Sequence, residues 1–342
     1  KMIRIGGAQI PVTKNINLNV EQLKKAIDWA SENKVDYLLT PEGALSGYMN
    51  SYDFLKENDL EIITRSLIQY ASERNVGMAL GTEYIERVGF GEVKRSQIRY
   101  YNETGVELGF YNKQMTIPGE QSYPGDGPTL IDIENWNSTG RSEFKIGSFI
   151  CNDAWGQRDN QQIIINDLFY YESQNTNVLF HASNGFRGPD AGTEQDNVNL
   201  RLFSDMHLWM MSRYHMPIVT VDNCYTLNGE FYDGPTSSTS GVIHNGEWLV
   251  KAAPTGTEYF SLNKSGKFLY FPNKKGNYNF TFSNDKKKSQ KSIIVIDAEP
   301  VLENTRLSTL YIGIDNPLSI KTSEFDEEDN LIAEINDGNV IR

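Results

Sequence analysis

The chain has 342 residues, which is enough for one large domain or two of ordinary size. Hydrophobic residues make up 39% and charged residues 23%, a balance typical of soluble globular proteins, and no apolar stretch approaches the roughly 20 residues of a membrane span. The formal net charge of −13 argues against a nucleic-acid-binding surface, which is normally basic. We therefore expect neither a membrane nor a nucleic acid as a partner.

Cysteine and histidine usage limits the metal and redox chemistry. The two cysteines, Cys151 and Cys224, lie 73 positions apart and form neither a disulfide framework nor a Cys-x-x-Cys pair. The four histidines show no zinc-binding spacing. No P-loop and no Gly-x-Ser-x-Gly elbow is present. The sequence thus predicts a cytoplasmic protein that needs no metal and no cofactor.

Apolar periodicity predicts alternating strands and helices in the first half of the chain. Residues 20–30 are expected to be helical because Val20, Leu23, Ile27 and Ala30 fall on one face. In chain order we expect a strand over 2–9, a helix over 20–30, a strand over 35–43, a helix over 57–74, a strand over 76–86, a hairpin over 97–114 with the turn NETG, and a strand over 144–151.

The second half repeats this alternation, which favours an α/β layered fold. We expect a helix over 157–174, a strand over 177–183, a helix over 194–214, and strands over 217–224, 237–244, 247–253 and 291–299. In the 194–214 helix, Leu202, Met206 and Trp209 share a face. The Lys- and Asn-rich segment 263–290 is expected to be a solvated loop, with a basic patch as the alternative. The tail after about residue 300 is polar and acidic.

Three predicted strands end in residues of catalytic type. Glu42 follows a buried strand in LLTPEGALSGY, Lys113 ends a hairpin strand in FYNKQ, and Cys151 ends the strand in KIGSFICNDAW. An acid, a cation and a thiol at strand ends are what an active site in a layered α/β fold requires. Each also has a structural explanation: Glu42 as a surface acid, Lys113 as an exposed lysine, and Cys151 as a small core residue.

Together the three segments resemble those of the carbon–nitrogen hydrolase (nitrilase/amidase) superfamily. In that family a glutamate follows the second strand, a lysine lies in a Tyr-Arg-Lys-like segment, and a cysteine ends a Gly-x-x-Ile/Val-Cys strand. Here Glu42, Lys113 and Cys151 occur in this order, 71 and then 38 positions apart. The opening strand, the segment LWMMSRYHMPIVTVDN and the hairpin TSGVIHNGEWLVKA are also similar, so the resemblance covers about residues 2–262 and the strand near 291–299.

The resemblance implies a four-layer αββα sandwich and hydrolysis of a non-peptide C–N bond. We expect a hydrolase domain over 1–300, with 263–290 as an insertion, and a tail over 301–342 that either lies at a subunit interface or is loose. The expected substrate is a small linear amide or N-carbamoyl compound. A homodimer or larger homo-oligomer is also expected, because members of the family usually assemble through dimers.

The family's residue roles can be transferred to this sequence position by position. Cys151 is then the nucleophile, Glu42 the general base, and Lys113 the oxyanion stabiliser, aided by the backbone N–H of Asn152. Glu120, seven residues after Lys113, is the expected second glutamate that orients the substrate and the lysine. Substrate-binding candidates near these segments are Tyr48, Asn152, Asp153, Trp155, Asn184, Phe186 and Arg187, the last of which suits a carboxylate.

Departures from the family pattern leave the substrate class open. Asn112 stands where an arginine often precedes the lysine, and the RYHMP segment lacks the usual acid. The sequence after Cys151 lacks the Trp-Glu pair of many nitrilases and is closer to amidase-type members. Three alternatives remain: a nitrilase acting on a nitrile, an idle binding subunit with the same fold, and a papain-like Cys–His protease.

Overall fold

The computed structural model describes residues 3–117, 119–133, 144–155, 163–185, 193–214, 216–225 and 234–261, and the backbone of strands beyond residue 267. Its contacts divide the chain into two compact units. The core unit comprises Ile5–Ile133 and Phe144–Ser261. The C-terminal unit comprises Lys1–Arg4, Glu134–Glu143 and Leu262–Arg342.

Two six-stranded sheets form the centre of the core unit. Their strand orders are β12-β1-β2-β3-β4-β5 and β11-β10-β9-β8-β7-β6. Strands β1, β2 and β3 run parallel, as do β7, β8 and β9, and antiparallel strands complete each sheet. The strands are β1 (Ile5–Gln9), β2 (Tyr37–Leu39), β3 (Gly77–Val88), β4 (Gly91–Tyr101), β5 (Glu107–Asn112), β6 (Ile131–Ile133), β7 (Phe144–Ile150), β8 (Val178–Ala182), β9 (Ile218–Val221), β10 (Gly241–His244), β11 (Glu247–Lys251) and β12 (Glu258–Ser261).

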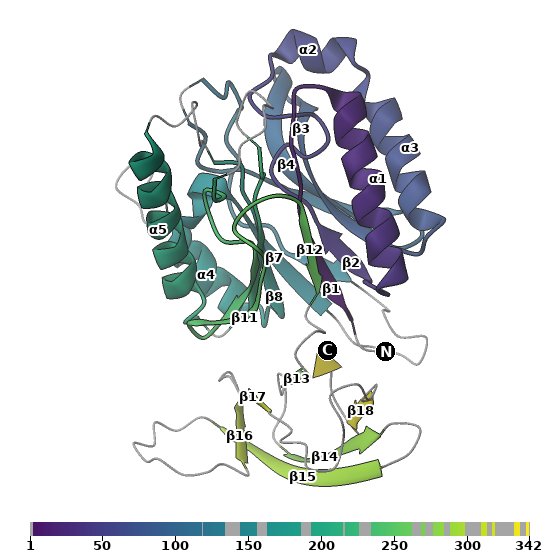
Figure 1. The fold of residues 1–342 in the computed structure, drawn as a ribbon, viewed down its shortest axis with the longest axis vertical. Coiled ribbons are helices and arrows are strands. Elements are labelled where there is room, and N and C mark those ends of the chain that lie inside the picture. The colour runs from purple at the N-terminus through teal and green to yellow at the C-terminus, as the bar shows by residue number, and fades with distance from the viewer. Residues whose placement is uncertain are drawn as a thin grey trace. The chain divides into compact units, whose positions relative to one another are not determined.

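Helices cover the outer face of each sheet (Figure 1). Helices α1 (Ile16–Glu32) and α3 (Leu60–Ser72) bury their apolar faces against the first sheet in one hydrophobic cluster. Helices α4 (Ile163–Ser173) and α5 (Glu194–Met211) contribute to a second cluster on the other sheet. The short helix α2 (Tyr52–Glu57) precedes α3.

The inner faces of the two sheets pack against each other. The Tyr100 hydroxyl lies 2.6 Å from Ser148 Oγ, and the Tyr100 ring stacks on Phe180 at 6.1 Å between centroids. These contacts join β4 of one sheet to β7 and β8 of the other. The layers therefore run helix, sheet, sheet, helix, which confirms the predicted αββα sandwich.

Strand direction brings two of the three predicted strand ends to one edge of the first sheet. β2 runs parallel to β3, and β5 runs in the same direction because it is antiparallel to β4, which is antiparallel to β3. Parallel strands in one sheet present their carboxyl ends at one edge. Glu42 and Lys113 follow β2 and β5, so they emerge at this edge of the first sheet.

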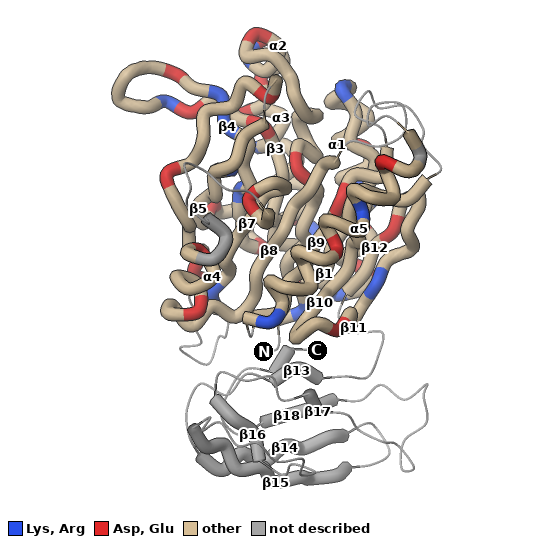
Figure 2. The backbone as a smooth tube through the Cα atoms, turned by 90° about the vertical axis from the view of Figure 1, so that its left-hand side faces the viewer, with Lys and Arg blue, Asp and Glu red and all other residues tan. Residues whose placement is uncertain are grey.

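Strand β4 begins earlier than the sequence predicts and forms a long hairpin with β3. We expect a hairpin over 97–114, and its turn after Asn102 is confirmed, but β4 already begins at Gly91 and pairs with β3 along its whole length. The segment GFGEVK includes the tip of this hairpin. Figure 2 shows acidic and basic residues interspersed along it. Charged residues at a solvent-facing tip hide the alternation on which strand prediction depends.

The segment 263–290 is not the loop that we expect from its composition. It contains β13 (Phe268–Tyr270) and β14 (Gly276–Ser283), and β15 (Lys288–Asp297) begins within it. The sequence GNYNFTFS alternates aromatic with small or polar residues, a strand pattern that the surrounding Lys and Asn residues mask. The alternative of a basic patch concerns side chains outside the described residues.

The C-terminal unit contains two small sheets, ordered β17-β13-β19 and β16-β15-β14-β18. Its remaining strands are β16 (Thr309–Ile312), β17 (Pro317–Leu318), β18 (Ile332–Ile335) and β19 (Val340–Ile341). The strand expected at 291–299 corresponds to β15, which pairs with β14 and β16. The expectation of one hydrolase domain to residue 300, followed by a tail, stays a prediction.

Candidate active site

Glu42 lies in a turn that passes directly against β3. Gly81 permits this approach, because a Cβ at Gly81 would stand 1.8 Å from the Pro41 carbonyl oxygen. The turn is fixed by the Leu45 N–H, which donates to Gly81 O at 3.1 Å. The Glu42 residue is 1% exposed, so its carboxylate depends on protein partners rather than water.

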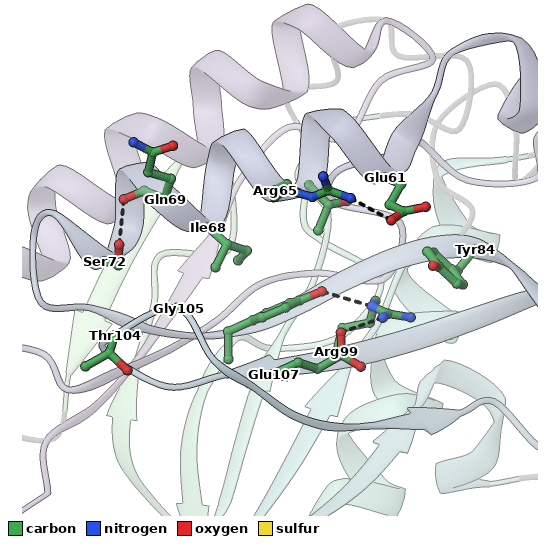
Figure 3. Close-up of a pocket in the computed structure, with 12 residues that line it drawn as sticks. Glu61, Arg65, Ile68, Gln69, Ser72, Tyr84, Arg99, Thr104, Gly105 and Glu107 are labelled. Atoms are coloured by element: carbon green, nitrogen blue, oxygen red, sulfur yellow. Dashed lines mark hydrogen bonds and ion pairs between the residues drawn. The ribbon is translucent and has the colours of Figure 1, made fainter.

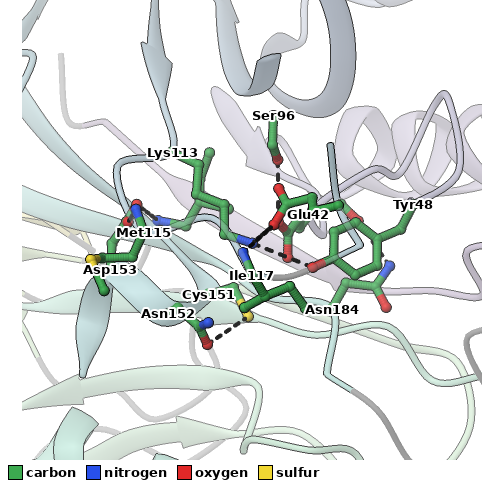
Figure 4. Close-up of polar contacts among 12 residues, drawn as sticks. Glu42, Tyr48, Ser96, Lys113, Met115, Ile117, Cys151, Asn152, Asp153 and Asn184 are labelled. Atoms are coloured by element: carbon green, nitrogen blue, oxygen red, sulfur yellow. Dashed lines mark hydrogen bonds and ion pairs between the residues drawn. The ribbon is translucent and has the colours of Figure 1, made fainter. Parts of the chain in front are cut away.

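Lys113 supplies the main partner of that carboxylate. It directly follows β5 and is 1% exposed. Its Nζ donates to Glu42 Oε1 at 2.7 Å and to Glu120 Oε2 at 3.0 Å (Figure 4). Glu120 is itself fixed by the Ile117 N–H at 3.1 Å. One buried ammonium thus lies between two buried carboxylates.

Two oxygen atoms of this cluster point away from these bonds. Glu42 Oε2 and Glu120 Oε1 are buried and have no hydrogen-bond partner among the described residues. A buried oxygen without a partner costs free energy that the fold recovers only if another molecule supplies a donor. The two atoms are therefore positions where a substrate or water can bind.

Cys151 directly follows β7 in a strained backbone conformation. Its φ is +47°, a region that non-glycine residues rarely adopt, and it begins the 3₁₀ helix η1 (Cys151–Ala154). The sharp change of direction sets the thiol at the strand end, below the Glu42–Lys113 pair in Figure 4. Such strain persists only where surrounding contacts fix the conformation.

Asp153 provides several of those contacts. Its Oδ1 accepts from the Gln114 and Met115 N–H groups at 3.0 and 2.6 Å. Its Oδ2 accepts from the Tyr111 hydroxyl at 2.8 Å and from the Ile150 N–H at 3.0 Å. This fully buried carboxylate therefore ties the cysteine turn to the segment after Lys113, and these four bonds occupy both of its oxygens.

Electrostatics set the resting protonation state of the site. Burial raises the pKa of Glu42 to about 8, against the opposing effect of the Lys113 cation. Burial also raises the pKa of Cys151 to about 12, with the Glu42 charge adding to the rise and Lys113 opposing it. Burial alone lowers the pKa of Lys113, but the surrounding acids, Glu42 foremost, raise it well above its ordinary value. The resting site therefore holds a neutral thiol beside a permanent cation.

The remaining predicted residues lie around this centre. The Tyr48 hydroxyl is 3.4 Å from Lys113 Nζ. Asn152 Oδ1 accepts from Trp155 Nε1 at 3.1 Å and lies 3.8 Å from Cys151 Sγ. Asn184 Nδ2 donates to the Glu42 carbonyl at 3.1 Å. The two other candidates, Phe186 and Arg187, lie outside the described residues.

His181 does not contact the sulfur as a catalytic histidine would. Its Nε2 lies 3.3 Å from the Cys151 carbonyl oxygen and its Nδ1 lies 2.8 Å from Thr220 Oγ1. Burial lowers the pKa of His181 to about 4, so the ring is neutral at pH 7. Its hydrogen bonds support the cysteine backbone, which is not the geometry of a papain-like Cys–His pair.

The structure adds two residues that the sequence analysis does not single out. Ser96 Oγ donates to Glu42 Oε1 at 3.2 Å, and Asn223 Nδ2 donates to Asn184 Oδ1 at 3.0 Å. Both are fully or almost fully buried. The signal for Ser96 would be a polar residue at a position of β4 that faces the other sheet. Which positions face that way is known only once the strand register is known.

A separate pocket of about 490 Å³ lies on the outer face of the first sheet (Figure 3). It is lined by residues of α3 and of strands β3 to β5, and contains none of the residues described above. Its lining residues are Glu61, Thr64, Arg65, Ile68, Gln69, Ser72, Tyr84, Arg99, Tyr101, Thr104, Gly105 and Glu107.

The described residues contain neither a metal-binding cluster nor a membrane-spanning helix. Within the described ranges, no group of three or more His, Cys, Asp or Glu side chains is arranged to hold a metal ion. Of the helices described, none combines the length and apolar character needed to cross a bilayer.

The sequence matches no protein-family model and no curated protein, whereas the structure matches solved structures. The amidase NitN from Nesterenkonia sp. AN1 is 15% identical, with a TM-score of 0.56 over 76% of this chain and 91% of that chain. A variant of the AN1 enzyme is described as an amidase of the nitrilase superfamily.

A glutamine-dependent NAD⁺ synthetase from Acinetobacter baumannii is 18% identical, with a TM-score of 0.54 over 76% of this chain and 45% of that chain. At such identities the similarity establishes the fold. It agrees with the two six-stranded sheets and their covering helices described above. The chain therefore has the fold of the carbon–nitrogen hydrolase (nitrilase) superfamily.

Proposed function

We propose that the chain hydrolyses the C–N bond of a small linear amide or N-carbamoyl compound through a thioester on Cys151. The observation that carries the proposal is the buried Lys113 ammonium, bonded to both Glu42 and Glu120 at the site of the Cys151 thiol. A cation held in this way is available to an oxyanion that forms beside the sulfur, and the unpartnered oxygens of the two glutamates are available to protons.

The protonation states suit a concerted first step. A thiol with a pKa near 12 is not a thiolate at neutral pH, so Glu42 must accept its proton as sulfur attacks the carbonyl carbon. The C–S bond forms, and the carbonyl electron pair moves to oxygen, where Lys113 Nζ and the Asn152 N–H stabilise it. Glu42 then protonates the nitrogen as the C–N bond breaks, which releases ammonia or an amine and leaves the thioester.

Water completes the cycle through the same groups. Glu42 removes a proton from water as its oxygen attacks the thioester carbonyl, and Lys113 again stabilises the oxyanion. The C–S bond breaks, and the sulfur recovers the proton from Glu42. A pKa of about 8 lets Glu42 exchange protons in both directions near neutral pH.

The substrate class rests on the solved neighbours and on the site. One structure of the Nesterenkonia amidase shows acrylamide added at its active-site cysteine, and another contains butyramide. Glu120 Oε1 is free to accept a substrate N–H, and Tyr48, Asn152, Trp155 and Asn184 lie around the centre. We include Phe186 and Arg187 as further binding residues on the basis of sequence alone.

The test compares Cys151→Ala with Cys224→Ala. Wild-type protein and Cys224→Ala should release ammonia from butyramide and gain one iodoacetamide adduct at Cys151 by intact-protein mass, whereas Cys151→Ala should do neither. Cys224 is a matched control because it is the other cysteine, is also buried, and forms no disulfide. Hydrolysis that survives in Cys151→Ala would overturn the cysteine mechanism.

The same assay separates the alternatives. A panel of butyramide, an N-carbamoyl amino acid and butyronitrile identifies the reactive group, because an amidase leaves the nitrile unchanged and a nitrilase converts it to acid and ammonia. Failure to label Cys151 with any electrophile, in folded protein, would indicate an idle binding subunit. The free state of both cysteines supports a reducing cytoplasmic location as part of this proposal.

We further propose that the protein is a homo-oligomer that assembles through α4 and α5. The stripe containing Leu202, Met206 and Trp209 is exposed, by 65%, 51% and 48%. Eight of the thirteen exposed large apolar side chains of the described residues lie on these two helices, and such a patch marks a protein interface. Leu202→Asp should lower the mass measured by light scattering, whereas Ile62→Asp, at an exposed apolar site on α3, should not.

A further inference from the structure

The turn that carries Tyr48 is strained. Met49, the next residue, has a φ of +59°, in the left-handed region that an unbranched non-glycine residue adopts only at a cost. A conformation of this kind persists only where neighbouring groups over-determine it. The contacts that hold this turn are therefore informative about its use.

A buried ion pair between β3 and β4 holds the turn in place. Glu83 Oε1 accepts from the Met49 N–H and Glu83 Oε2 accepts from the Asn50 N–H, each at 3.0 Å. Lys94 Nζ donates to Asn50 O at 2.7 Å and to Glu83 Oε1 at 3.0 Å. The Glu83 and Lys94 side chains are 0% and 2% exposed. Three bonds from two charged residues thus fix two successive residues of the turn, and a fourth joins the two charged residues to each other.

The turn delivers Tyr48 to the catalytic lysine. The Tyr48 hydroxyl lies 3.4 Å from Lys113 Nζ, and Nζ lies 5.3 Å from the centroid of the Tyr48 ring. Tyr48 is 3% exposed, so it has little room to move independently of the turn. A displacement of Met49 or Asn50 therefore moves Tyr48 and, through it, the Lys113 ammonium.

A purely structural role explains this arrangement poorly. Burying two charges is expensive, and a well-packed apolar pair is often as stable as a buried ion pair. A carboxylate does, however, provide two fixed acceptors for successive backbone N–H groups, which an apolar side chain cannot supply. What the ion pair supplies is a fixed backbone position beside Tyr48.

We propose that Glu83 and Lys94 are positioning residues that act through Tyr48 to set the Lys113 ammonium where the oxyanion forms. This inference rests on the proposed hydrolase function, because it assigns the pair to the same site. Neither residue touches the reacting atoms. Their effect should appear as a coupling between Glu83 and Tyr48, which independent structural defects would not produce.

The experiment is a double-mutant cycle of Glu83→Gln and Tyr48→Phe, with kcat and KM measured for butyramide hydrolysis. Each single variant should lower kcat about tenfold to a hundredfold with little change in KM, because the loss arises in the transition state. The kcat of the double variant should lie within about twofold of the kcat of the less active single variant. Additive losses, or full activity in folded Glu83→Gln, would overturn the proposal.

Controls separate positioning from loss of folding. Glu86→Gln removes a comparable carboxylate from the same two strands, where Glu86 pairs with Arg95 at 2.7 Å on the opposite face of the sheet, and should keep wild-type kcat. If Glu83→Gln does not fold, the combined change Glu83→Met with Lys94→Met leaves no unpaired buried charge and replaces it in the cycle.

A second readout does not depend on hydrolysis. The rate at which iodoacetamide alkylates Cys151 should show the same coupling between positions 83 and 48, because the reagent's carbonyl binds beside Lys113. Wild-type protein that releases no ammonia from any amide would refute the proposed function but leave this cycle to be measured. Independent effects on alkylation would refute the positioning role in either case.

Discussion

Charged clusters of different construction lie on the two sides of the first sheet. On the inner face, Lys113, Glu42 and Glu120 place one ammonium between two carboxylates, and two of the carboxylate oxygens have no partner among the described residues. On the outer face, in the pocket of Figure 3, Arg99 pairs with Glu107 at 2.6 Å, and Arg65 pairs with Glu61 at 2.7 Å.

The Arg99 cluster on the outer side uses its hydrogen-bonding groups within the protein, whereas the inner cluster leaves two carboxyl oxygens without a partner among the described residues. The Arg99 guanidinium also donates to the Tyr101 hydroxyl and to Gln97 Oε1, so its donors are used within the protein. In the inner cluster one ammonium serves two carboxyl groups, and burial raises the pKa of Glu42 to about 8, so that Glu42 largely holds its proton at neutral pH. One oxygen of each carboxyl group is buried without a partner among the described residues, a cost that folding alone does not explain. We take these unpartnered oxygens, more than burial or pocket volume, as the mark of chemistry.

The largest effect is expected from removing the inner cation. Lys113→Met should lower kcat/KM at least about 10²–10³-fold, because it removes an oxyanion donor, and should destabilise the fold by about 3–5 kcal/mol by leaving two carboxylates buried without a cation. Ammonia release and urea unfolding measure the two effects. The outer counterpart, Arg99→Met, should unfold more easily yet retain kcat/KM. Equal loss of activity in both variants would remove the distinction between the two faces.

The inner cluster should also make the proposed hydrolysis depend on pH. Because the base form of Glu42 is required and its pKa is raised to about 8, kcat/KM should rise with pH and level off above about pH 8. Glu42→Gln should abolish the rise together with most of the activity. A flat profile between pH 6 and 9 in wild-type protein would contradict the assignment of Glu42 as the base.

The sign of the accompanying stability change follows from the same shift. The unfolded chain releases the Glu42 proton near the ordinary pKa of about 4.5, whereas the folded chain holds it to about pH 8. The Glu42 contribution to the free energy of unfolding therefore falls as pH rises between these values. Unfolding of wild-type and Glu42→Gln protein across this range should show a smaller decline in the variant, where Asp153, whose pKa burial raises to about 6, still contributes.

The placement of the catalytic candidates was largely predictable from sequence, for a physical reason. Glu42 and Cys151 come after short apolar runs, which mark buried strands, and Lys113 comes at the end of a predicted hairpin strand. The layered fold then brings such ends together. The position of each strand was therefore predictable from the local sequence, and the layered fold determines where the strand ends meet.

The supporting contacts could not be predicted in the same way. The pairing of Glu83 with Lys94 depends on the register of two long strands, which shifts every side chain to the other face if it slips by one residue. For α5, periodicity placed Leu202, Met206 and Trp209 on one face but did not show that this face is exposed. In the C-terminal unit, lysines and asparagines concealed the aromatic alternation of β14.

A smaller effect on activity is expected from changing Asp153, a buried carboxylate whose two oxygens both accept hydrogen bonds. Asp153 accepts four hydrogen bonds, and an asparagine in its place would oppose an N–H to the N–H of Ile150 or Met115. Asp153→Asn should therefore cost about 1–3 kcal/mol of stability. The kcat of the folded fraction should fall less than in Glu42→Gln, as measured by activity per labelled Cys151. A loss as large as that of Glu42→Gln would give Asp153 a direct catalytic part.

The smallest effect should come from the exposed ion pair of the outer pocket. Arg65 and Glu61 are one helical turn apart on α3, and their side chains are 74% and 67% exposed. Water screens such a pair and both side chains lose freedom in forming it, so Arg65→Ala should change stability by about 0.5 kcal/mol or less and leave kcat/KM unaltered. Thermal unfolding and ammonia release provide the two measurements. A marked loss of activity in Arg65→Ala would mean that a change in the outer pocket alters the position of Lys113 across the sheet. The completeness of hydrogen bonding would then no longer distinguish a structural cluster from a catalytic one.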